Sequence, residues 1–268
     1  MIRQMITHDD ITQLPKIHFA GYSDIKPMPG SELIEALADS YHHVGLDDTI
    51  VVTRSNKRAN IFNQGIRNMV LDREEELSQG DILMIVKNNY YWMEEERKSN
   101  NKLKSNDIPA FLANGDRAKV LKVRRRIDLY GFRFATLLLQ FPDYDNYELE
   151  ATVLLDTLTS EAPALTHEQQ EQLFHQIEED YQDIPLKADR MKAIRQDQFF
   201  NALQVKFAYA VTCHKAQGGQ WAHVYVDQGY MTDDMLNPDY IHWLYTAFTR
   251  ATEMLYLVNW PETQTALE

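Results

Sequence analysis

Strand-like and helix-like segments alternate at both ends of this chain, and a β-rich stretch separates the two alternating regions. Short apolar or β-branched runs of strand type lie at 48–53, 82–86, 205–211, 221–226 and 254–258. Apolar residues at helical spacing occur at 31–45, 56–70 and 241–252. Alternation of this kind is typical of a parallel sheet packed with helices. The sequence therefore predicts an α/β parallel-sheet domain, formed by residues 1–87 and 200–268, with an inserted module at 88–199.

The inserted module is predicted to be a small antiparallel β-barrel with an acidic helical segment. The turn residues Asn114-Gly-Asp116 precede two strand-like runs at 118–123 and 132–141, a pattern that suits a barrel better than a helical insert. Charged, helix-like segments follow at 166–181 and 186–200, and 94–107 has the charge density of an exposed loop. Tyr90, Tyr91 and Trp92 fit alternate positions of a strand, which favours core packing over stacking on bases.

The net charge of −13 argues against a nucleic acid partner, but the charges are unevenly distributed. An acidic run occupies 161–183, and a basic cluster contains Arg117, Lys119, Lys122, Arg124, Arg125 and Arg126. The last three arginines are candidates for binding the phosphates of a single strand, with an affinity that falls as salt rises. The alternative is that the cluster balances the acidic helix that follows it in the chain.

The sequence also favours a reducing compartment. Cys213 is the single cysteine, so an intramolecular disulfide is excluded. The first ten residues are too polar for a signal peptide, and no apolar run approaches membrane-spanning length. The nine histidines lack the spacing of metal ligands. We expect a cytoplasmic chain with no membrane contact and no metal site of its own.

The segment Tyr209-Ala-Val-Thr-Cys-His-Lys-Ala-Gln-Gly-Gly-Gln-Trp221 carries the most chemistry. It reads as a strand that runs into a polar turn, and ligands commonly bind where parallel strands end. Thr212, His214 and Lys215 would lie at this end, and the paired glycines Gly218 and Gly219 would let the backbone approach a phosphate or a sugar. The alternative is a surface turn with solvated polar residues.

A second segment, Trp243-Leu-Tyr-Thr-Ala-Phe-Thr-Arg-Ala-Thr252, reads as a helix that ends near Arg250. A lone arginine in this position is usually a solvated charge or a salt-bridge partner. It could instead act as an arginine finger, because a guanidinium stabilises the charge that develops on a transferred phosphoryl group.

Together the two segments resemble the fifth and sixth conserved motifs of superfamily 1 helicases of the RecD-like kind. That family reads Thr-x-His-Lys-x-Gln-Gly and Tyr-Thr-Ala-x-Thr-Arg-Ala, and both stretches occur here in the same order. Two earlier stretches also resemble this family. Ile2-Arg-Gln4 looks like the end of the fourth motif, and Thr53-Arg-Ser-Asn-Lys-Arg58 looks like the Asn-Lys segment that follows it. Gly80–Asn89 and Asn114–Val120 resemble the edges of the small SH3-like barrel that these helicases carry.

The resemblance implies the second RecA-like domain of an ATP-driven DNA motor, and it implies roles for single residues. Arg250 and Arg3 would reach the γ-phosphate, and Gln4, Gly219 and Gln220 would lie near the nucleotide. Asn56, Lys57, Thr212, His214 and Lys215 would contact single-stranded DNA, with Arg124, Arg125 and Arg126 of the barrel along the same strand. The sequence departs from the family at Ala118, which replaces a glycine, and at Gln220, where a glutamate is common.

Two elements of a complete motor are missing from this sequence. None of the ten glycines is followed by lysine, so there is no phosphate-binding loop, and no Asp-Glu pair is present to hold magnesium. We therefore expect ATP and Mg²⁺ to be bound mainly by an N-terminal RecA-like domain, with recombination or exonuclease subunits as further partners. The alternatives are a stand-alone nucleic-acid-binding module without ATPase activity and an α/β interaction protein.

Overall fold

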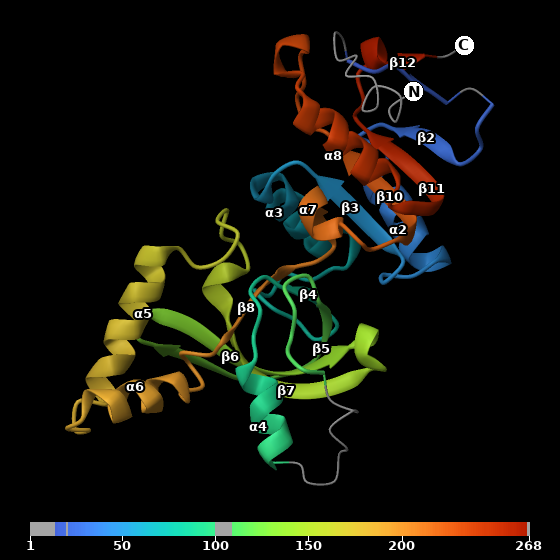
Figure 1. Ribbon diagram of the computed structural model, residues 1–268. Coiled ribbons are helices and arrows are strands. Elements are labelled where there is room, and N and C mark those ends of the chain that lie inside the picture. The colour runs from blue at the N-terminus through green and yellow to red at the C-terminus, as the bar shows by residue number, and fades with distance from the viewer. Residues whose placement is uncertain (1–13, 20, 100–108, 267–268) are drawn as a thin grey trace. The chain divides into compact units, whose positions relative to one another are not determined.

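The computed structural model describes residues 14–19, 21–99 and 109–266, and it divides the chain into two compact units (Figure 1). One unit, the sheet unit, contains the residues up to Glu74 and those from Tyr209 onward. The other, the barrel unit, contains Glu75–Ala208. No described helix is long and apolar enough to cross a membrane.

The sheet unit is built on a five-stranded parallel sheet with the strand order β2-β11-β10-β3-β9. These strands are β2 (Ile25–Met28), β3 (Thr49–Thr53), β9 (Ala210–Thr212), β10 (Trp221–Asp227) and β11 (Ala251–Val258). All five residues of β3 are buried, as expected for a central strand with both faces covered. The parallel sheet expected for a RecA-like domain is therefore present. A separate parallel pair joins β1 (Ile17–His18) to β12 (Thr265–Ala266).

Two of the helices around this sheet begin at side-chain caps. The helices are α2 (Leu33–His43), α3 (Asn56–Gly65), the π-helical turn η1 (Ile66–Val70), α7 (Cys213–Ala216) and α8 (Pro238–Phe248), with 3₁₀ turns η4 (Asp233–Met235) and η5 (Glu262–Gln264). The Ser55 hydroxyl accepts a hydrogen bond from the Arg58 amide at 3.2 Å and so caps α3. Asn237 caps α8 by accepting from the Tyr240 amide at 2.8 Å, and Pro238 occupies the first turn.

The barrel unit contains a closed barrel with the strand order β4-β5-β6-β7-β8. Its strands are β4 (Ile82–Ile85), β5 (Arg117–Leu129), β6 (Phe132–Phe141), β7 (Tyr147–Leu154) and β8 (Leu203–Phe207), with 3₁₀ turns η2 (Pro142–Tyr144) and η3 (Leu155–Thr157). All neighbouring pairs are antiparallel except β7 and β8, which are parallel. The expected barrel is present, and its SH3-like identity stays a prediction.

The boundaries of the inserted module differ from the expected 88–199. The runs 82–86 and 205–211 were expected in the parallel sheet, but β4 and β8 pair with each other and close the barrel. The run 205–211 is divided at Ala208 and Tyr209, so that only β9 enters the sheet. The run 82–86 is apolar throughout and 205–211 is interrupted only by Lys206, and runs of this kind suit a small barrel as well as a parallel sheet.

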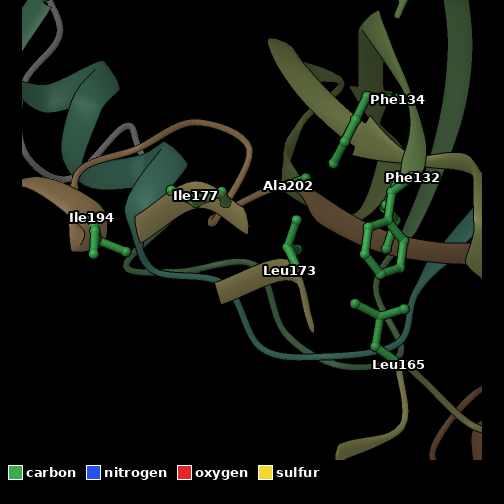
Figure 2. Close-up of a cluster of buried hydrophobic side chains, with 8 residues drawn as sticks. Phe132, Phe134, Leu165, Leu173, Ile177, Ile194 and Ala202 are labelled. Atoms are coloured by element: carbon green, nitrogen blue, oxygen red, sulfur yellow. The ribbon is translucent and has the colours of Figure 1, made fainter. Parts of the chain in front are cut away.

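Three helices complete the barrel unit: α4 (Tyr91–Ser99), α5 (His167–Asp180) and α6 (Lys187–Arg195). Thr166 and Gln169 form a capping box at the start of α5. Figure 2 shows Leu173 and Ile177 of α5 on one side of a hydrophobic cluster and Phe132 and Phe134 of β6 on the other. The helices α5 and α6 thus pack on the barrel through a shared core.

Two expectations for 88–107 are wrong where the structure describes this stretch. Residues 94–99 belong to α4 and are not an exposed loop. Tyr91 and Trp92 begin that helix instead of alternating along a strand, and the Trp92 indole donates to the Asn201 carbonyl at 2.9 Å. The charged residues of α4, Glu94 to Lys98, are consecutive and so show no helical period, and no apolar stripe long enough to reveal the helix accompanies them.

Candidate functional site

Several of the expected DNA-contacting residues meet at the carboxyl edge of the parallel sheet. Thr53 of β3 is in register with Thr212 of β9 on one side and with Asp227 of β10 on the other. Asn56 and Lys57 follow Thr53 at the start of α3, where Lys57 is exposed. Thr212 precedes α7, and its hydroxyl makes no capping hydrogen bond there. The sheet therefore brings the two segments together at one edge.

Arg250 and the paired glycines lie at the opposite, amino edge of the sheet. Trp221 begins β10 and is in register with Ala251 at the start of β11. β10 has seven residues, so the two edges are about 20 Å apart. The segment expected to form one cluster therefore spans the sheet, with Thr212 at one edge and Gly219 at the other.

The Arg250 guanidinium is held by three hydrogen bonds. Its Nε donates to the Thr246 carbonyl at 2.9 Å, and its two terminal nitrogens donate to the Gly219 carbonyl at 2.9 Å and to the Thr249 hydroxyl at 3.0 Å. These bonds use three of the five N–H donors of a guanidinium, and the other two have no partner among the described residues. The side chain thus joins the end of α8 to the Gly219 turn and keeps capacity for an anion.

Gly219 also has a structural role in the turn before β10, and its expected place near the nucleotide stays a prediction. Its amide, the one group here that could donate to a phosphate, donates to the Ala216 carbonyl at 3.1 Å, and its carbonyl accepts from Arg250. A Cβ at this position would lie 2.3 Å from the buried Trp221 ring. Gly218 adopts a φ of +88°, where an L side chain is strained. The pair of glycines therefore closes the turn beneath an indole, and Gln220 beside it is exposed.

Gly219→Ala is expected to destabilise the chain by about 1–3 kcal/mol, because a rigid indole must move to admit the methyl group. Urea denaturation followed by circular dichroism measures the change. Gly65→Ala is the matched control, since a Cβ there meets only the flexible end of Met69 at 3.3 Å. Equal stability of the two variants would contradict the role assigned to Trp221.

Two arginines near the carboxyl edge were not anticipated from the sequence. Arg58 makes a bidentate ion pair with the buried carboxylate of Asp227, at 2.8 and 2.7 Å, and this hydrogen bonding raises the pKa of Arg58. Arg54 lies over the ring of Tyr240, 5.5 Å from its centroid. The sequence did contain one indication of the ion pair. Arg58 lies in the first turn of a helix, where a positive charge is unfavourable for the helix dipole unless a carboxylate lies nearby.

A cavity of about 420 Å³ lies between α7 and α8. It is lined by Cys213, His214, Gln217, Asp239, His242, Trp243 and Thr246. The Trp243 indole nitrogen is buried and has no acceptor among the described residues. Burial raises the pKa of the Cys213 thiol to about 11 and lowers the pKa of the half-buried Lys215. The cavity thus offers exposed His214 and Gln217 beside a thiol that stays protonated.

The basic cluster of the barrel unit lies on β5, and two of its three candidate arginines are ion-paired. Arg124 pairs with Glu150 of β7, and Arg126 contacts Glu75 at 3.7 Å and donates to the Leu77 carbonyl at 2.8 Å. Neither carboxylate belongs to the acidic helix α5, so these two contacts do not provide the charge balance with that helix that was the alternative to phosphate binding. Arg125 lines a smaller cavity of about 140 Å³.

Arg3 and Gln4 lie outside the described residues, so their expected places near the nucleotide stay predictions. In the described part of the chain, no group of three or more His, Cys, Asp or Glu side chains could hold a metal ion. The site therefore consists of the carboxyl-edge residues, the cavity between α7 and α8, and the Arg250–Gly219 contact.

One comparison with known protein families matches the same segment. Residues 207–258 match the family model of the UvrD-like helicase C-terminal domain, and this stretch includes Thr212, His214, Gly219 and Arg250. The match supports a superfamily 1 helicase C-terminal region in this chain. No curated protein matches. Among solved structures, the chain is similar to the Pif1 helicase from Candida albicans, with 15% identity and a TM-score of 0.32; the match covers 81% of this chain and 47% of that one. The chain thus spans about half the length of that helicase.

Proposed function

We propose that this chain is the second motor domain of a RecD-like DNA helicase, which couples ATP hydrolysis to translocation along single-stranded DNA. The observation that carries the proposal is the path of residues 212–220. This segment starts beside Thr53 at the carboxyl edge, lines the cavity through His214 and Gln217, and reaches Gly219, which accepts a hydrogen bond from Arg250. Single-stranded DNA bound at the carboxyl edge of the sheet and a nucleotide bound beside Arg250 would thus be connected through one short segment.

The chemistry of the site fits this division of roles. Arg250 keeps two N–H donors for the γ-phosphate of ATP, and a guanidinium there stabilises the charge that develops during phosphoryl transfer. Thr212, His214, Asn56 and Lys57 supply hydroxyl, imidazole, amide and ammonium groups, which suit phosphate and sugar oxygens. ATP and Mg²⁺ would be held mainly by an N-terminal RecA-like domain, which this chain would meet in a cytoplasmic motor. The RecD-like assignment implies recombination or exonuclease subunits as further partners.

The chain alone is expected to bind a single-stranded oligonucleotide without hydrolysing ATP, because it has the strand contacts but no phosphate-binding loop. Fluorescence anisotropy with a labelled oligonucleotide measures the binding, and phosphate release measures the turnover. His214→Ala combined with Thr212→Val is expected to weaken binding several-fold. His42→Ala, an exposed histidine on α2, is the control. Turnover stimulated by DNA, or unchanged affinity in the double variant, would refute this assignment.

A further inference from the structure

A second cavity, of about 230 Å³, lies in the barrel unit and has a distinctive lining. Its floor includes Leu165, Leu173 and Ala202, which belong to the hydrophobic cluster in Figure 2. The remaining lining residues are aromatic, amide or basic: Lys87, Asn88, Asn89, Tyr90, Tyr91, Gln170, Phe200, Asn201 and Gln204. The lining contains no carboxylate, although the chain as a whole has 40 acidic residues and 27 basic ones.

Two aromatic side chains of this cavity are exposed, and each packs against another ring. Tyr90 is 53% exposed and stacks on Phe111, with the ring centroids 4.8 Å apart. Phe200 is 37% exposed and meets the edge of Phe174 at 6.2 Å. Because each ring is supported from behind, little conformational entropy is lost when a planar group packs against it. Flat aromatic surfaces of this kind stack on nucleobases.

The amide groups of the cavity are held in defined orientations. The Gln204 Oε1 accepts from the Leu165 amide at 2.9 Å, so its Nε2 is fixed and has no acceptor among the described residues. Gln170 is anchored at both ends, by the Leu165 carbonyl at 2.8 Å and by the Lys87 ammonium at 3.2 Å. A fixed amide donor beside a stacking surface matches the carbonyl edge of a base, and Lys87 offers a positive charge for the adjoining phosphate.

We infer that this cavity binds a single unstacked nucleobase of the DNA strand. Its volume is below the roughly 300–1,000 Å³ of pockets for drug-sized ligands, which suits one ring system. Because α5 supplies Gln170 and Leu173, the helices packed on the barrel create the cavity that a bare barrel would lack. The inference rests on the proposed single-strand binding, and it assigns the barrel unit a base contact that does not depend on the β5 arginines.

The experiment compares two labelled strands of equal length and charge: oligo(dT) and an oligonucleotide in which every base is missing. Phe200→Ala and Tyr90→Ala in the full chain are each expected to weaken oligo(dT) binding by about 10-fold and to leave binding of the abasic strand unchanged. Tyr230→Ala removes a 78% exposed tyrosine of the sheet unit and is the matched control. Circular dichroism checks that each variant folds, and Phe200→Tyr should retain binding because it keeps the stacking ring.

The other outcomes are distinct. If wild-type chain binds oligo(dT) and the two variants bind it equally well, the cavity does not hold a base, and an aromatic side chain of a protein partner becomes its better occupant; the proposed function then stands. Equal losses on both strands would also overturn the base contact. If the wild type binds neither strand, the inference and the proposed strand binding both fail. Thymidine monophosphate that competes as strongly as oligo(dT) would show a site for free nucleotide instead of a strand.

Discussion

Arg250→Ala is expected to lower DNA-stimulated ATP turnover by about 10³-fold or more in a motor that joins this chain to a first RecA-like domain. The reason is that a guanidinium aimed at the γ-phosphate stabilises charge only in the transition state, so its loss reduces the rate and leaves ground-state DNA affinity nearly unchanged. Arg250→Lys should restore little, because an ammonium cannot keep the Gly219 and Thr246 contacts and also reach a phosphate.

The structure gives Arg250 a second role, which the experiment must separate from the first. Loss of its bonds to Gly219 and Thr246 could loosen the turn before β10 and lower stability without any role in hydrolysis. Thermal unfolding of each variant, measured with the turnover, distinguishes the two. Thr249→Val is the control, since it removes one hydroxyl contact to Arg250 and leaves the guanidinium in place. If the Arg250→Ala variant hydrolyses ATP at the wild-type rate, Arg250 has only a structural role.

The elements of the parallel sheet were largely predictable, because their local signals agree with the final fold. The β-branched run 48–53 became β3. The helix expected at 241–252 became α8, which starts earlier, at a proline in the first turn, and ends at Phe248, so that 251–252 belong to β11. The strand run 221–226 is β10 with one added residue. In each case a buried strand or an amphipathic helix has a single stable environment, so the pattern determines the element.

The barrel was harder to delimit, because its closure depends on pairing between distant strands. β4 and β8 are separated by more than a hundred residues, and neither the apolar run of β4 nor the mainly apolar run of β8 distinguishes a barrel from a parallel sheet. β7 was not predicted, because its pattern changes along the strand. Glutamates occupy alternate positions in its first half, whereas its second half is buried on both faces. Register between remote strands is a tertiary property that no local period encodes.

The composition of the site was predictable, but its geometry was not. The motif residues Thr212, His214 and Arg250 stand in one unit as expected, yet the parallel register puts them at opposite edges of the sheet. The indole over Gly219 and the ion pair between Arg58 and Asp227 join residues whose contact no spacing rule foresees. Sequence patterns indicate which chemistry is present, and the pairing of strands decides where each group acts.

Arg58→Met is expected to destabilise the chain by about 3 kcal/mol, because it leaves the Asp227 carboxylate without its partner. That carboxylate is 2% exposed, whereas the Arg58 side chain is 40% exposed, so the unpaired charge would be the buried one. Methionine keeps an apolar stem of similar length over the Phe62 ring, which the guanidinium now faces at 5.3 Å. The effect measured by urea denaturation should therefore report the lost ion pair more than lost packing.

A double variant tests this explanation directly. Asp227→Asn in the Arg58→Met background removes the unpaired carboxylate and should recover part of the lost stability. The effects of the two substitutions on the free energy of unfolding should therefore not be additive. Lys57→Met alters the exposed neighbour and should change stability by less than about 0.5 kcal/mol. Because the ion pair ties the start of α3 to the end of β10, its loss should also weaken single-strand binding through Asn56. Additive effects of the two substitutions would mean that Arg58 stabilises this edge through its stem alone.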